Sequence, residues 1–122
     1  MRASKYMFTL DVQREQSQIC LAAMQGDTNR MLCISFSDGG IPLVLDEGTT
    51  ATIFIERPTG SIIESFCDVS EGGANVVYPF TETTCAVDGL HRCLLILYDS
   101  EGRQLHSPWF TMHVAKKKIV QT

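Results

Sequence analysis

The side chains that could bind a metal or act as nucleophiles in this chain are five cysteines and three histidines. The cysteines are Cys20, Cys33, Cys67, Cys85 and Cys93, and no two of them have the C-x-x-C spacing. Because their number is odd, a disulfide framework would be incomplete. We therefore expect thiols that pack as small apolar groups in or beside strands, rather than a zinc site or a catalytic thiol.

The three histidines, His91, His106 and His113, do not pair with another histidine or a cysteine at a short metal-ligand spacing. We expect them to have surface or capping roles. The sequence also lacks a G-x-S-x-G nucleophile motif and a phosphate-binding glycine loop followed by a helix. We therefore predict no metal, no cofactor and no enzymatic activity, although a cysteine and a histidine brought together by folding would escape this reasoning.

Two loops resemble ligand-binding loops only in part. Residues 99–102, Asp-Ser-Glu-Gly, begin like a calcium loop but lack its distal glutamate. Residues 26–29, Gly-Asp-Thr-Asn, carry side chains that commonly bond their own backbone. Both segments are therefore predicted to be turns between strands.

The single tryptophan, Trp109, could stack on a sugar ring, as exposed aromatic side chains do in carbohydrate-binding modules. Tyr98 and Phe110 are near it in the sequence, and Pro108 directly before it predicts a break in a strand. Packing in the core or at an interface is the favoured interpretation of Trp109. A carbohydrate-binding module remains the alternative.

Short strands must position these residues. Residues 94–98 are an unbroken apolar run, residues 99–102 supply turn chemistry, and a return strand alternates apolar side chains at Phe110, Met112 and Val114. Runs of this kind recur about eight or nine times, and residues 81–84 could form one short helical turn. The spacing predicts an all-β fold, an antiparallel sandwich of two sheets.

The composition fits one globular domain. The chain has 122 residues, of which 44% are hydrophobic, and we expect a domain over residues 1–122 with a core from about 5 to 115 and a tail or linker start at 116–122. A net charge of -4 and a pI of about 5.2 argue against nucleic-acid binding. With no apolar run near the ~20 residues that span a bilayer and no secretory signal, we expect folding in a cytoplasm and no membrane contact.

Four segments of common chemistry follow one another in an order that spans nearly the whole chain. They are Tyr-Met-Phe-Thr-Leu-Asp at 6–11, Gly-Asp-Thr-Asn at 26–29 with the following strand and the Asp-Gly-Gly turn at 38–40, Arg-Pro-Thr-Gly at 57–60, and a last set of Gly89, residues 95–98, the Asp-Ser-Glu-Gly turn at 99–102, Leu105, Ser107, Pro108 and Phe110. As an ordered set they resemble one known family, the N-terminal immunoglobulin-like domain of phage baseplate upper proteins, found in tailed phages and prophages of Gram-positive bacteria.

The resemblance implies an immunoglobulin-like β-sandwich with a structural role and no catalytic residues. Such a domain would attach receptor-binding or accessory tail parts to the baseplate hub. Its partners would be other tail proteins and further copies of itself, in a virion tail baseplate assembled in the host cytoplasm. Family members usually continue into a helical linker and a distal module, whereas this sequence stops at Thr122.

Loops and strand edges would make the protein–protein contacts of such a domain. From the sequence we expect the docking surface, or the glycan-contact surface of the alternative, at two places. These are the loop with Asp27, Thr28 and Asn29, and the strand break with Pro108 and Trp109.

Overall fold

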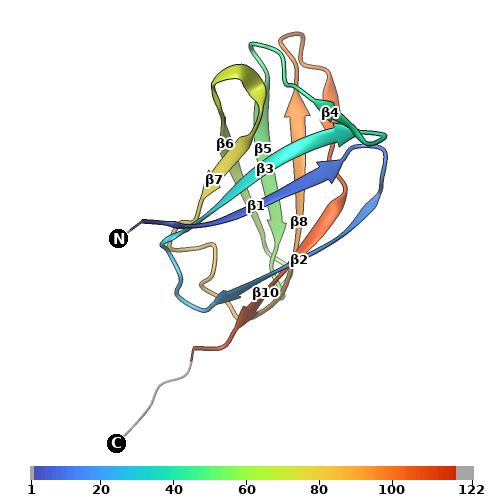
Figure 1. The fold of residues 1–122 in the computed structure, drawn as a ribbon. Helices are drawn as coiled ribbons and strands as arrows, with labels where there is room; N and C mark the ends of the chain where they lie inside the picture. Colours follow the sequence, from blue (N-terminus) through green and yellow to red (C-terminus); the bar gives the residue numbers. More distant parts are fainter. Residues whose placement is uncertain (1, 118–122) are drawn as a thin grey trace, which may run out of the picture.

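The computed structural model describes residues 2–117, which form short strands joined by turns (Figure 1). Within this part of the chain, ten strands surround one core, and a single 3-10 turn interrupts them. No helix among residues 2–117 has the length and apolar character needed to cross a bilayer. The elements are β1 (Ser4–Asp11), β2 (Gln16–Met24), β3 (Arg30–Asp38), β4 (Ile41–Leu43), β5 (Thr50–Glu56), β6 (Ile62–Val69), η1 (Glu71–Gly73), β7 (Val76–Pro79), β8 (Gly89–Tyr98), β9 (Gln104–His106) and β10 (Trp109–Ala115).

The strands form one sheet that curves round until it almost closes. Their order is β1-β3-β7-β6-β5-β8-β10-β2, with β4 added beside β3 and β9 beside β8. Strands β1 and β2 end this order, and they diverge from their shared loop with a seam between them (Figure 1). The predicted all-β class is confirmed, and the sheet is barrel-like.

The division into two sheets is not confirmed, because β6 belongs to both halves of the molecule. Residues 62–67 of β6 pair with β5. Asp68 and Val69 then pair with Val77 and Val76 of β7. Since one strand bridges the two halves by backbone hydrogen bonds, the sheet is continuous through residues 68 and 69 of β6, and the seam separates its two ends.

The sequence predicted antiparallel pairing throughout, and this is wrong for two pairs of strands. β1 runs parallel to β3, from Ser4 opposite Arg30 to Asp11 opposite Ser37. At the other end of the order, β2 runs parallel to β10. The two consecutive strands β1 and β2 therefore do not form a hairpin, because each adds to a different, distant strand.

The break predicted before Trp109 is present. β9 pairs with residues 96–98 of β8, and β10 pairs with residues 89–93 of the same strand. Between them, Ser107 Oγ accepts a hydrogen bond of 2.9 Å from Leu95 N and so replaces a backbone partner in the ladder. The strand thus changes course without leaving a buried donor unsatisfied.

The core lies inside the curved sheet and follows the alternation of the strands. Leu10, Ile34, Ile53 and Leu95 are fully buried, and the ring of Phe110 lies 5.2 Å from that of Phe8. Each such aliphatic side chain contributes roughly 1.5–3 kcal/mol by leaving water. This interior holds the strands of both halves in register.

The predicted helical turn does not form at residues 81–84, which make hydrogen-bonded turns instead. The hydroxyl of Thr84 is buried, 2.7 Å from the hydroxyl of Tyr78 and 3.0 Å from Thr81 N. These bonds hold the segment in a compact loop over the core. The 3-10 turn is at Glu71–Gly73, where Gly72 has a φ of 82°.

The predicted tail at 116–122 starts after the last strand, with Lys116 and Lys117 exposed. Residues 118–122, including the last lysine of the basic run, lie outside the described part of the chain.

Candidate functional site

The structure separates the two places where the sequence predicted a docking surface. Trp109 pairs with Gln16 at the start of β10, while Ala115 pairs with Met24, next to the loop that holds Asp27. Six residues of strand at about 3.3 Å each put roughly 20 Å between the two places. They are therefore two separate surfaces.

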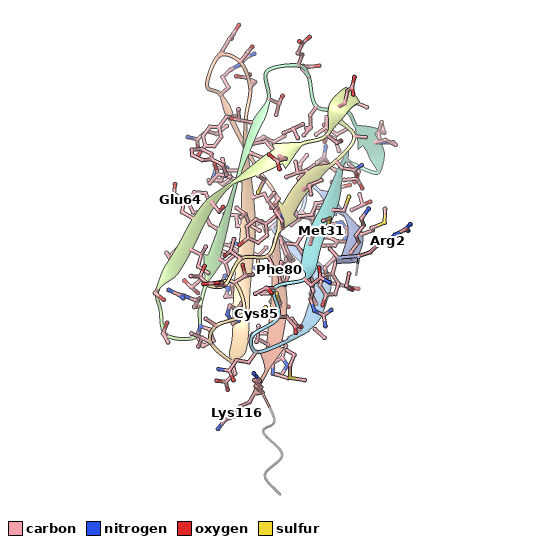
Figure 2. The ribbon with its side chains drawn as sticks, turned by 90° about the vertical axis from the view of Figure 1, so that its left-hand side faces the viewer. Arg2, Met31, Glu64, Phe80, Cys85 and Lys116 are labelled. Atoms are coloured by element: carbon pink, nitrogen blue, oxygen red, sulfur yellow. The ribbon has the colours of Figure 1, made fainter. Side chains whose placement is uncertain are left out.

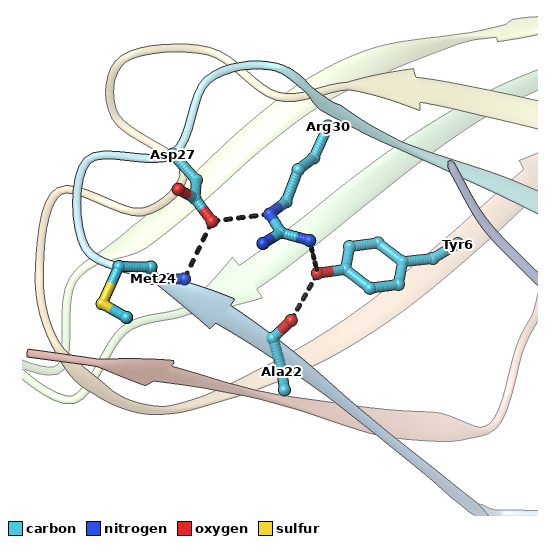
Figure 3. A network of polar contacts seen from close by, with 5 residues as sticks. All are labelled: Tyr6, Ala22, Met24, Asp27 and Arg30. Carbon is cyan, nitrogen blue, oxygen red and sulfur yellow. Dashed lines mark hydrogen bonds and ion pairs between the residues drawn. The ribbon is translucent and has the colours of Figure 1, made fainter. Parts of the chain in front are cut away.

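The loop at Asp27 has a structural task at the seam (Figure 3). Asp27 Oδ2 accepts a hydrogen bond of 2.9 Å from Met24 N and one of 2.5 Å from Arg30 Nε. Burial acts to raise the pKa of Asp27, but these hydrogen bonds outweigh it, so the pKa lies below its usual value. The carboxylate is thus held charged by groups of its own chain.

Arg30 carries this network across the seam (Figure 3). Its Nη1 donates to the hydroxyl of Tyr6 at 2.5 Å, and its guanidinium lies 5.4 Å from the centre of the Tyr6 ring. The Tyr6 hydroxyl in turn donates to the carbonyl of Ala22 in β2. A side chain of β1 thereby supplies the hydrogen bond that a neighbouring strand would give to Ala22. We call Tyr6, Arg30 and Asp27 the seam latch.

The other predicted residues of this loop differ in exposure and in role. Thr28 is exposed. Asn29 Nδ2 donates to Arg2 O at 3.1 Å, and the Asn29 carbonyl accepts from Ser4 N at 3.0 Å. Asn29 therefore anchors the start of β1.

Around the strand break, Pro108 is buried and Trp109 is half-buried. The guanidinium of Arg92 lies 4.4 Å from the Trp109 ring centre, and Arg92 is also 3.5 Å from Glu56. One face of the indole is thus covered by a cation of the same chain. The ring contributes to the surface through its remaining side.

Trp109 belongs to a larger apolar surface, on the outside of the sheet, which the sequence did not predict. We call it the outer apolar face. A shallow hollow is lined by most of its members, together with Glu56. Ile62 is 60% exposed and Phe66 is 85% exposed, so much of this apolar surface faces solvent. Its residues, from β5, β6, β8 and β10, are Phe54, Ile62, Phe66, Leu94, Ile96 and Trp109.

One signal in the sequence could have revealed this face. Residues 94–98 are apolar on both sides of the strand, whereas a strand with a solvated outer side alternates. The structure places Leu95 and Leu97 in the core and turns Leu94 and Ile96 outward. Monomeric proteins rarely expose contiguous apolar patches of several side chains, so this face is suited to a protein contact.

Four of the five cysteines lie in strands, and Cys67, Cys85 and Cys93 pack in or against the core, as the sequence predicted. Cys85 and Cys93 are buried, Cys33 and Cys67 are half-buried, and Cys20 is exposed. Burial raises the pKa of Cys93 and Cys67 to about 12 and that of Cys85 to about 11. These three thiols are therefore poor nucleophiles at neutral pH.

The histidines are less uniform than predicted. His106 and His113 are exposed, but His91 is fully buried, with Nδ1 3.1 Å from Gly89 O. Burial lowers the pKa of His91, which favours the neutral ring. Its Nε2 has no hydrogen-bond partner within residues 2–117. In the same part of the chain, no three histidine, cysteine or acidic residues are grouped so as to hold a metal ion.

Comparison with known proteins gives a family and a fold. The family model of the BppU N-terminal domain matches residues 4–122. The N-terminal domain of phage TP901-1 ORF48 superposes with a TM-score of 0.71 at 15% identity, covering 93% of this chain and 99% of that one. Fibronectin(III)-like modules of Clostridium thermocellum CbhA align at 13% identity, covering 90% of this chain and 98% of theirs. Their TM-score of 0.48 is too low to indicate a shared fold. No curated protein sequence matches the chain.

Proposed function

Since this chain belongs to the family of N-terminal domains of phage baseplate upper proteins (BppU), we propose that it docks accessory or receptor-binding tail parts onto the baseplate hub. The family places the protein in the tail of a virion, with other tail proteins as partners. The docking role goes beyond what membership of the family shows. The proposal holds whether the tail belongs to a phage or to a prophage, and the docked tail parts would serve attachment to a host cell.

The outer apolar face carries this proposal. Phe66 and Ile62 are largely exposed, and Ile62 also lines the hollow beside Trp109. Burial of apolar surface is the dominant favourable contribution to most protein–protein association. A face of this kind favours a protein partner, and the symmetry of a tail would repeat the contact.

The proposed role is non-enzymatic. Copies of the chain would associate with one another in the assembled particle, and the particle would be assembled in the host cytoplasm. The thiols of Cys67, Cys85 and Cys93 have raised pKa values, so they do not resemble activated nucleophiles. A rigid sheet with an apolar outer surface suits a connector, whose work is to hold partners in a fixed geometry.

Carbohydrate binding at Trp109 is the second candidate. Beside the ring lies a second, more polar hollow, lined in part by Gln13, Arg14 and His106, whose side chains could bond sugar hydroxyls. Against it, Arg92 already covers one face of the indole. A glycan array separates the two candidates, because saccharide binding that is lost in Trp109→Ala would favour this one.

The docking role is tested in particles. A phage or prophage that lacks this gene is complemented with an epitope-tagged chain, and purified tails are probed for the tag and imaged with gold-labelled antibody. We expect label at the baseplate. Phe66→Ser should reduce incorporation, whereas Met7→Ser, which changes a side chain 72% exposed on β1, should not. Tails without label would contradict the proposal.

A further inference from the structure

We propose that the free edge of β6 binds an extended segment of another baseplate protein as an added strand, and that Glu64 selects a segment with a basic side chain at its centre. This inference deepens the proposed docking function and rests on it. It concerns residues 62–67, the part of β6 that pairs with β5.

The edge is free because β7 covers only the end of β6. Pairing between β6 and β7 is confined to Asp68 and Val69. Along residues 62–67, β5 lies on one side, and no strand lies on the other within the described chain. Figure 2 shows Glu64 at the margin of the molecule, on the side away from β5. Exposed apolar edges of this kind are sites of strand pairing.

The backbone of this edge presents its hydrogen-bonding groups outward at every second residue. Arg57 N donates to Ser61 O at 2.8 Å, which marks that pair as hydrogen-bonded. Bonded and non-bonded pairs alternate in an antiparallel ladder, so Ile63 and Ser65 bond to β5. The N–H and C=O groups of Ile62, Glu64 and Phe66 therefore point to the free edge.

The far end of the strand agrees with this assignment. Ser70 N donates to Asn75 O at 2.9 Å, on the β7 side, and Ser70 has the same parity as Phe66 and Glu64. Of the edge groups, the Phe66 carbonyl receives a local hydrogen bond of 3.3 Å from Ser65 Oγ. A carbonyl has two lone pairs, so it can still accept from an added strand.

The side chains of the same three residues decide what can bind. Ile62 and Phe66 expose apolar surface on either side of the exposed Glu64. In an added antiparallel strand, the side chain opposite Glu64 lies about 4.5–5.5 Å away between Cβ atoms, and an opposite charge there is favourable. The complementary segment is apolar, basic, apolar at alternate positions. Ile62 also lines the hollow of the outer apolar face, so the segment can continue onto it.

A second copy of this chain is a poor occupant of the same edge. The two-fold register that brings Ile62 opposite Phe66 also brings Glu64 opposite Glu64 of the other copy. A register centred on Phe66 brings Glu64 opposite Asp68. Like charges directly opposite each other are destabilising, and the registers that set Glu64 opposite Ile62 or Phe66 leave its carboxylate without a cation, so the edge favours a different protein that supplies one.

Synthetic peptides test the edge by itself. The first peptide has isoleucine, lysine and isoleucine at alternate positions, with threonine between them. The second peptide has glutamate in place of the lysine. Amide hydrogen exchange of the free chain should be fast at Ile62, Glu64 and Phe66 and slow at Ile63 and Ser65. The lysine peptide should protect the first three amides, with roughly tenfold higher affinity than the glutamate peptide.

Two variants sharpen this test. Glu64→Lys should reverse the preference between the peptides. Glu64→Pro should abolish protection by either peptide, because it removes an edge N–H and blocks the approach of a strand. Equal binding of the two peptides, protection elsewhere on the chain, no protection at all, or a wild-type dimer with a protected β6 edge would overturn the inference.

Tail particles separate this inference from the proposed function. If the chain is incorporated into tails while Glu64→Pro is incorporated equally well, strand addition is wrong and docking stands. If the lysine peptide protects the edge but the chain is missing from tails, the edge inference stands and the docking function is wrong.

Discussion

Two of the free strand edges of the nearly closed sheet, the edge at the seam and the edge of β6, differ in how their backbone groups are bonded. At the seam, Tyr6 donates to the carbonyl of Ala22, and Arg30 holds the tyrosine hydroxyl in place. Along the free edge at residues 62–67 of β6, the hydrogen bond that the described part of the chain gives to an edge carbonyl is the local one from Ser65 Oγ to Phe66 O. The comparison teaches that this fold bonds one edge, at Ala22, with a side chain of its own and leaves the other edge without such a bond across it, as strand addition requires.

A pair of proline substitutions should show the largest effect and tests whether β6 is an edge. Ser65→Pro removes an N–H that bonds to β5, so we expect a loss of about 3 kcal/mol or more in the free energy of unfolding. Glu64→Pro removes an N–H that faces solvent and should cost far less. Urea titrations followed by fluorescence measure both values. Equal losses would show that residue 64 has a backbone partner.

Removal of the Arg30 guanidinium from the seam latch should cause the next largest loss in the free energy of unfolding. Arg30→Met leaves the Asp27 carboxylate and the Tyr6 hydroxyl without their partner, which we expect to cost about 1–3 kcal/mol. Arg103→Met is the control, because Arg103 is 75% exposed and pairs with Asp99 and Glu101 at the surface. Such exposed pairs contribute about 0–1 kcal/mol. Urea midpoints that agree for the two variants would show that the latch is an ordinary surface pair.

Acid should weaken the seam. The folded pKa of Asp27 lies below its unfolded value, so its contribution is present above the unfolded pKa of about 4 and is lost as the pH falls through the folded value. In Asp27→Asn this contribution is missing. The stability difference between wild type and Asp27→Asn should therefore be largest near neutral pH and shrink in acid, as urea titrations across pH would show. A difference that is constant with pH would contradict a role for the charge.

The strands could be predicted from the sequence, whereas their partners could not. Alternation identified the strand with Leu32, Ile34 and Phe36, and turn residues marked most strand ends. Local patterns do not encode which distant strand becomes a neighbour, so the parallel pairs and the double role of β6 were missed.

The candidate site was predictable to a similar degree. The turn chemistry of Asp27 was correct, but its partners Arg30 and Tyr6 come together only when the seam forms. β6 is recognisable in the sequence as a strand after the Arg-Pro-Thr-Gly turn, whereas the exposure of Ile62 and Phe66 was not predicted. Its free edge follows from the place where β7 stops, at Asp68 and Val69, which no local pattern contains.

The smallest changes in the free energy of unfolding are expected for substitutions of one aromatic side chain from each region. Tyr6→Phe deletes the hydroxyl that donates to Ala22 and accepts from Arg30, so it should cost about 1 kcal/mol. Phe66→Thr replaces a ring that is 85% exposed in the isolated chain. It should change the free energy of unfolding by no more than about 0.5 kcal/mol, because threonine suits a strand. Thermal and urea unfolding of both variants measure the difference. If Phe66→Thr destabilises the isolated chain as much as Tyr6→Phe does, Phe66 supports the fold itself, and the contrast between a latched and an open edge fails.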